Sequence, residues 1–67
     1  MKKRDLIMRM REIAKRAGVE LVLEGGAKHE KYRLNGHVVI VPRHAEVAEF
    51  TARAILKQCR AAVGEIE

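Results

Sequence analysis

The chain has 67 residues, with 14 Lys and Arg against nine Asp and Glu, and a net charge of +5 at pH 7. This length allows a single domain, residues 1–67, and a domain this small buries only about 60% of the surface of its unfolded chain. The positive balance favours anionic partners such as nucleic acid, but it does not choose between RNA, DNA, an acidic protein and a membrane surface.

The longest uninterrupted apolar run is "VVIV", residues 38–41, which is far too short to span a bilayer. The opening "MKKR" is not followed by the long apolar stretch of a signal peptide. A single cysteine, Cys59, cannot form an internal disulfide. We therefore expect a reduced, cytoplasmic protein with no membrane association.

Residues 5–17 carry apolar side chains at helical spacing, which predicts an amphipathic helix that ends at Gly18. The stripe consists of Leu6, Ile7, Met10, Ile13, Ala14 and Ala17. Residues 19–24, "VELVLE", alternate instead, with Val19, Leu21 and Leu23 on one side. This alternation predicts a half-buried strand, which "GGA" ends.

A tight hairpin is predicted at "NG", Asn35 and Gly36, because both central positions of such a turn need a positive φ. Leu34 then faces His37, and residues directly opposite share a sheet face. The more apolar face, expected to meet the helices, has Glu30, Tyr32, Leu34, His37, Val39 and Val41. The other face, expected to meet solvent or a partner, has His29, Lys31, Arg33, Val38 and Ile40.

A second helix is predicted from about Thr51 to Val63, with Thr51 as its N-cap and Gly64 at its end. Its apolar stripe is Ala52, Ile55, Leu56, Cys59 and Val63, so the Cys59 thiol is expected to be packed and inert. The element order is α-β-β-β-α. The predicted fold is α+β, a three-stranded antiparallel sheet with both helices packed on one face.

Four short segments in this order resemble the HicA family: "KKRDLI", "EGGAKHEKYRLNG", "VPRH" and "TARAILKQ". The resemblance covers nearly the whole chain. Family members are small toxins of bacterial and archaeal toxin-antitoxin modules that act as ribonucleases on mRNA. The resemblance therefore implies a fold like that of double-stranded-RNA-binding domains, an mRNA substrate, and a HicB-type antitoxin that covers the active face.

His29 matches the family's catalytic histidine, which lies at the start of the second strand and precedes an aromatic residue, here Tyr32. Ala27 and Lys28 stand where the family commonly has Gly and Ser. Imidazole transfers protons near neutral pH because its ordinary pKa is about 6.5, so one histidine can assist RNA cleavage by the 2′-hydroxyl without a metal or cofactor. Cationic side chains near His29 are the expected RNA-binding residues: Lys28, Lys31, Arg33 and Arg43.

We expect different roles for the other two histidines, His37 and His44. His37 is expected to flank the turn, at the fringe of the helix-facing side. His44, in the loop after Pro42, is a possible secondary site residue, although a structural hydrogen bond is its simpler interpretation. A zinc site is not expected, because His29 and His37 fall on opposite faces and no thiolate joins them. Tyr32 is expected in the core.

Two other functions are compatible with the sequence. One is a non-catalytic RNA-binding module of the same fold, but Glu46 and Glu49 lie where such domains grip a duplex backbone. A reader of single strands is disfavoured because no aromatic residue is predicted on the open sheet face. The other is a protein-interaction module, such as an inactivated toxin, whose sheet face binds only a partner.

Overall fold

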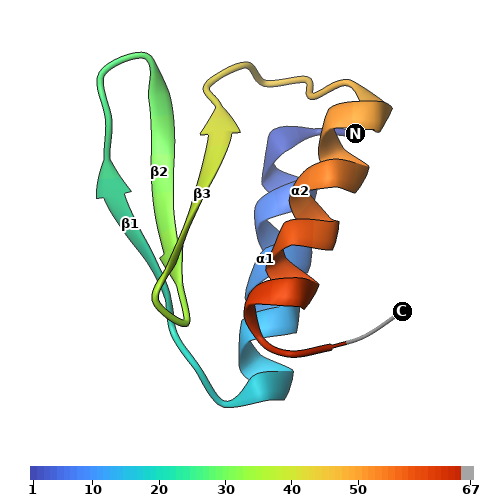
Figure 1. Ribbon diagram of the computed structural model, residues 1–67. Helices are drawn as coiled ribbons and strands as arrows, with labels where there is room; N and C mark the ends of the chain where they lie inside the picture. Colours follow the sequence, from blue (N-terminus) through green and yellow to red (C-terminus); the bar gives the residue numbers. More distant parts are fainter. Residues whose placement is uncertain (66–67) are drawn as a thin grey trace.

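The computed structural model describes residues 1–65 and confirms the predicted α+β architecture (Figure 1). The elements in chain order are α1 (Lys3–Ala17), β1 (Leu21–Gly25), β2 (His29–Leu34), β3 (His37–Pro42) and α2 (Glu49–Ala62). The three strands form one antiparallel sheet in the order β1-β2-β3. Both helices lie on the same side of this sheet, which leaves its other face open (Figure 1).

The β2–β3 hairpin has the predicted turn and the predicted register. Asn35 and Gly36 have φ values of 49° and 82°, and Leu34 pairs with His37. The pairing continues without a shift to His29 and Pro42 at the far end. Since side chains alternate between faces along a strand, this register assigns every residue of the hairpin to one face.

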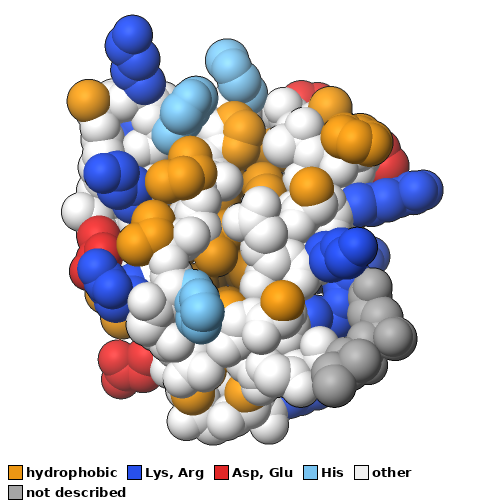
Figure 2. All heavy atoms as spheres, viewed as in Figure 1, with side chains coloured by type: hydrophobic (Ala, Val, Ile, Leu, Met, Phe, Trp, Pro, Cys, Tyr) orange, Lys and Arg blue, Asp and Glu red, His pale blue; other side chains and the backbone are white. Residues whose placement is uncertain are grey.

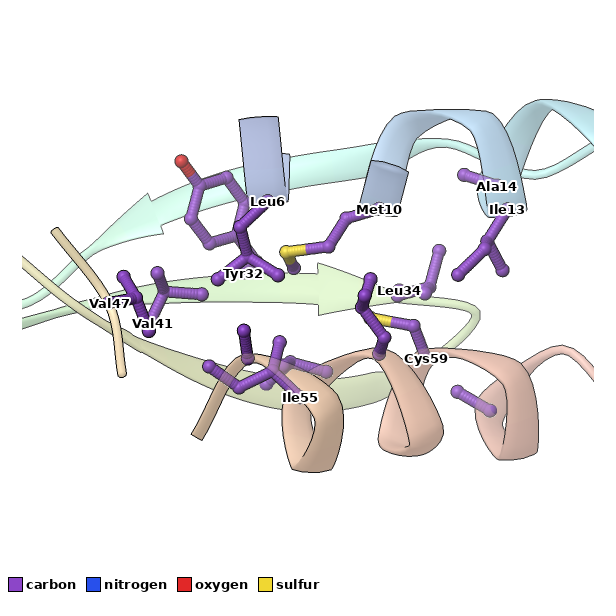
Figure 3. Close-up of a cluster of buried hydrophobic side chains, with 14 residues drawn as sticks. Leu6, Met10, Ile13, Ala14, Tyr32, Leu34, Val41, Val47, Ile55 and Cys59 are labelled. Atoms are coloured by element: carbon purple, nitrogen blue, oxygen red, sulfur yellow. The ribbon is translucent and has the colours of Figure 1, made fainter. Parts of the chain in front are cut away.

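The core lies between the helix pair and the inner face of the sheet (Figure 3). Leu34 and Val41 from the hairpin are fully buried there, against Leu6 and Met10 of α1. Cys59 is also fully buried, as predicted, and burial raises the pKa of its thiol to about 11. The inner face of the hairpin therefore forms part of the core, and only its outer face is available to bind a substrate.

Glycines end both helices in the way that the sequence predicts. After α1, Gly18 has a φ of 71° and the Val19 amide donates to the Ala14 carbonyl. After α2, Gly64 has a φ of 81° and the Glu65 amide donates to the Arg60 carbonyl. These contacts satisfy carbonyls that the last turn of a helix leaves without partners.

The predicted start of α2 is wrong. The helix begins at Glu49, its N-cap is Ala48, and no side chain caps it, so Thr51 lies inside the first turn. The Ala52 amide already donates to the Ala48 carbonyl at 2.9 Å. Glu49 supplies a negative charge to the first turn, where it opposes the positive end of the helix dipole. This earlier start places Phe50, which precedes the predicted start at about Thr51, in the first turn of the helix.

The N-terminal residues form a short ladder with the segment that precedes α2. The Lys3 amide donates to the Ala45 carbonyl, and the Val47 amide donates to the Met1 carbonyl, both at 2.8 Å. This ladder explains why α1 begins at Lys3 rather than at Asp5. It also holds the connection after β3 against the start of α1.

The strand β1 is less buried than its alternation predicts. It begins at Leu21 rather than Val19, and Leu23, opposite Tyr32 on the helix-facing side, remains 53% exposed. The helices cover mainly β2 and β3, which supply the buried strand residues of the core, so β1 is left partly uncovered. A register shift between Leu23 and Gly25 leaves Glu24 as the extra residue of a bulge.

The core predicts a clear difference between two leucines of the same sheet face. Leu34→Ala removes a fully buried side chain and should lower the free energy of unfolding by about 2–5 kcal/mol. Leu23→Ala, at a half-exposed position, should change it by about 0.5 kcal/mol or less. Urea denaturation followed by circular dichroism measures both. Similar losses in the two variants would contradict the observed burial.

Candidate active site

His29 is the first residue of β2 and lies opposite Pro42, the last residue of β3. Its side chain is exposed, as the register predicts for the open face. The imidazole is therefore accessible to a substrate, while the backbone that carries it is held in the sheet.

The loop that leads into His29 depends on Gly26. Its φ is 131°, and a Cβ atom there would overlap the carbonyl oxygen of His29. The Gly26 carbonyl in turn accepts a hydrogen bond from the Arg43 guanidinium. The loop before β2 and the segment after β3 are thus joined beside His29.

Glu30, on the inner side of β2, interacts with two cationic side chains at the end of the sheet where His29 lies. Glu30 accepts hydrogen bonds from Lys3 Nζ at 2.6 Å and from the Tyr32 hydroxyl at 3.1 Å, and Arg43 lies 3.7 Å away. The hydrogen bond from Lys3 is the main reason that the pKa of Glu30 falls below its ordinary value of 4.5. Glu30 thereby fixes α1 and Arg43 to the strand that begins at His29.

Tyr32 is a core residue, as predicted, with 5% of its surface exposed. Its ring packs beside Leu6 and its oxygen points away from the cluster (Figure 3), toward Glu30. Burial raises the pKa of Tyr32, and the neighbouring Glu30 adds to this effect. The Tyr32 hydroxyl thus stabilises the Glu30 carboxylate by a hydrogen bond. Both side chains lie on the sheet face opposite to His29.

The two predicted cations on β2 are in different situations. Lys31 is exposed on the open face, two positions from His29. Arg33 donates from Nε to Glu24 at 2.8 Å, and this hydrogen bond lowers the pKa of Glu24. Arg33 is also about 13 Å from His29 along the strand, at 3.3–3.4 Å per residue. Lys31 is therefore the better partner for a phosphate at His29.

Two imidazoles lie at one end of the sheet and the third lies at the other. Figure 2 shows two histidines close together where β2 begins and β3 ends, and one near the β2–β3 turn. His29 pairs with Pro42 and His44 follows Pro42 by two residues, so both belong to this end of the sheet. His37 directly follows the turn at the other end. His37 is exposed, at the fringe as predicted. The His44 side chain is exposed and makes no hydrogen bond or ion pair with the rest of residues 1–65, so nothing there supports its structural interpretation.

The sheet end at His29 thus brings together most of the predicted site. Lys28 is exposed in the loop just before His29, and Arg43 and His44 follow directly after β3. Between these cations, the open face exposes three apolar side chains, Val22, Val38 and Ile40. A basic and partly apolar surface of this kind suits contact with a macromolecule.

Sequence reasoning missed the supporting residues Lys3, Gly26 and Glu30. The sequence did contain a signal for Glu30. An acidic residue at a helix-facing position of a strand indicates that a cation pairs with it, because charges away from water are usually paired. Its partner lies 27 residues away, in the first turn of α1. Only the tertiary arrangement identifies that partner.

No helix within residues 1–65 is long and apolar enough to cross a membrane. Over the same residues, no group of three or more His, Cys, Asp and Glu side chains is arranged to hold a metal ion.

Gly26→Ala should destabilise the protein more than Gly25→Ala, by about 1 kcal/mol or more. Both glycines have positive φ, which disfavours alanine at either position, but only at Gly26 does the new Cβ overlap the His29 carbonyl. Gly25 therefore controls for backbone strain. Urea denaturation measures the difference, and equal losses would mean that the close approach to His29 is not a constraint.

Glu30→Gln should cost about 1–2 kcal/mol of stability at pH 7, because it removes charged hydrogen bonds. The folded-state pKa of Glu30 is lowered, so its contribution is present above pH 4.5 and is lost as the pH falls through the folded-state value. The gap between wild type and variant should therefore shrink at pH 3. The exposed Glu20→Gln serves as control, and a gap that is the same at both pH values would contradict the ion pair.

Comparison with protein families identifies a family model that matches most of the chain. Residues 8–61, most of the chain and including His29, His44 and every strand, match the family model described as HicA toxin of bacterial toxin-antitoxin systems. No curated protein and no solved structure matches the chain. The chain belongs to the HicA toxin family.

Proposed function

We propose that this HicA toxin is a metal-independent endoribonuclease that cleaves mRNA with His29 as a general acid or base. One observation carries the proposal: the exposed His29 lies at the start of β2, opposite Pro42, on an open basic face and within the segment that matches the family. An mRNA substrate of a cytoplasmic toxin fits the net charge of +5.

The proposed reaction uses a nucleophile that RNA itself provides. The 2′-oxygen loses its proton to a base and forms a bond to the adjacent phosphorus. The bond from phosphorus to the 5′-oxygen breaks, and an acid supplies the proton that this oxygen takes. His29 performs one of these transfers, and His44, at the same end of the sheet, is the secondary candidate for the other.

The neighbouring cations are proposed to hold RNA phosphates. Lys31 shares the open face with His29 and would neutralise charge that develops on the phosphorus. Arg43, anchored to Gly26 and Glu30, and Lys28 would bind the phosphate at the sheet end. Arg33 is better suited to a neighbouring phosphate, for which it would have to exchange its contact with Glu24.

The same face is proposed to bind a HicB-type antitoxin. Membership of the family implies a toxin-antitoxin partnership. Val38 and Ile40 are 47% and 42% exposed between the cations of the open face, although this small domain has little apolar surface to spare. An antitoxin surface with acidic groups opposite Lys31 would cover both the apolar residues and His29.

His29→Ala should reduce cleavage of a single-stranded RNA by about 10²- to 10⁴-fold, which is the usual worth of one positioned proton transfer. His37→Ala is the matched control, because it removes an exposed histidine from the opposite end of the same hairpin. The rate should be measured by gel electrophoresis with EDTA present, on variants that retain the wild-type circular dichroism spectrum.

Wild-type cleavage by folded His29→Ala would refute the catalytic role of this residue. Expression in growing cells provides a second readout: the wild-type chain should arrest growth and His29→Ala should not. Arrest by both variants would point to a protein-interaction function instead.

A further inference from the structure

Phe50 is the most exposed large hydrophobic residue of residues 1–65. It is 86% exposed in the first turn of α2, compared with 59% for Met8 and 53% for Leu23. It is also the one phenylalanine of the chain. An aromatic side chain that is left in water contributes little to the stability of a domain with so small a core. Its position on the outside of α2 therefore calls for a binding role.

Two cations follow Phe50 along the same outer side of α2. Arg53 and Lys57 lie three and seven residues after Phe50, which is the spacing of one helix face. Both are exposed, and neither has an ion-pair partner within residues 1–65. They are about 6 Å apart along the helix axis. We call Phe50, Arg53 and Lys57 the α2 tract.

Negative charge is absent along the tract. No Asp or Glu occurs from Phe50 to Ala62. The nearest carboxylate, Glu49, lies within 3.6 Å of the Met1 ammonium group and lines a hollow with Met8 and Arg9 of α1. The tract thus has two cations and one aromatic ring, with no carboxylate from Phe50 to the end of α2.

The α2 tract lies at the end of the connection that leaves the candidate active site. Two exposed carboxylates, Glu46 and Glu49, precede the tract, at 3.3 and 3.6 Å from the Met1 ammonium group. The connection after β3 runs from the His29 end of the sheet to the first turn of α2 (Figure 1). In Figure 2, exposed Lys and Arg side chains along α2 appear on the same side of the molecule as the two neighbouring histidines. An RNA strand held at His29 can reach Phe50 along this side, past Glu46 and Glu49, whose charges the Met1 ammonium group partly offsets.

We infer that the α2 tract binds single-stranded RNA next to the cleavage site, with a base stacked on Phe50 and phosphates at Arg53 and Lys57. Aromatic rings interleaved with cations are the usual means of binding single strands. A helix face that docks on a protein groove presents several apolar anchors. The other exposed residues that follow on α2 are Ala54, Gln58 and Ala61, so Phe50 is the one large apolar side chain there. This inference rests on the proposed function in that it assigns the tract to the same substrate.

The binding test uses wild-type chain and a labelled twelve-nucleotide 2′-O-methyl RNA, which cannot be cleaved because its 2′-oxygen is blocked. Phe50→Ala should weaken binding by about 5- to 150-fold, the worth of one stacked base. Met8→Ala, a half-exposed apolar residue on α1, is the matched control and should bind as wild type does. Fluorescence anisotropy measures both.

The cations are tested by their salt dependence. Arg53→Gln with Lys57→Gln should lower the slope of log K against log salt by about 1.4, for two phosphate contacts to a single strand. Arg11→Gln with Lys15→Gln removes two exposed cations of the same spacing from α1 and should leave more of the slope intact. Equal slopes in the two double variants, or unchanged binding by Phe50→Ala, would overturn the inference.

Cleavage assays separate this inference from the proposed catalysis. Tract variants should raise KM for a twenty-nucleotide RNA and leave the cleavage of dinucleoside monophosphates unchanged, because these are too short to reach α2. His29→Ala should impair both substrates. Tract variants that bind and cleave the longer RNA normally, but no longer bind an antitoxin, would show that the tract serves a protein partner and would refute its role in RNA binding.

Discussion

The turn at Asn35 and Gly36 is the constraint on which the rest of the structure depends. Its two positive φ values fix the register of β2 against β3, and a slip of one residue would exchange the two faces of a strand. In the observed register, Leu34 and Tyr32 enter the core while His29 and Lys31 remain outside. The same turn therefore determines both the core and the candidate active site.

The charges of this small domain are arranged around that hairpin. Glu30, on the inner side of β2, ties Lys3 of α1 and Arg43 of the following segment to the strand. The outer side carries cations and exposed apolar groups that contribute little to folding. A domain with little core gives up stability when it leaves Val38, Ile40 and Phe50 in water, which is the pattern expected of surfaces selected for binding.

Local signals in the sequence were enough to predict the element order, the hairpin register and the face of each hairpin residue. The rest depends on contacts between distant segments. The early start of α2 has no capping side chain to signal it, and the start of α1 depends on its ladder with residues 45–47. The bulge at Glu24 and the pairing of Glu30 with Lys3 likewise need the tertiary fold. His29 was predicted as a site residue from the family resemblance. Arg43 and His44 come to the same end of the sheet only through the pairing of β2 with β3.

The central claim is that the open face of the hairpin binds RNA at His29. The most direct measurement is an NMR titration of the ¹⁵N-labelled protein with a 2′-O-methyl RNA. The account predicts shift changes at His29, Lys31 and Ile40, whose side chains share the open face. Changes confined to the outer surface of α1, with the hairpin unaffected, would contradict it.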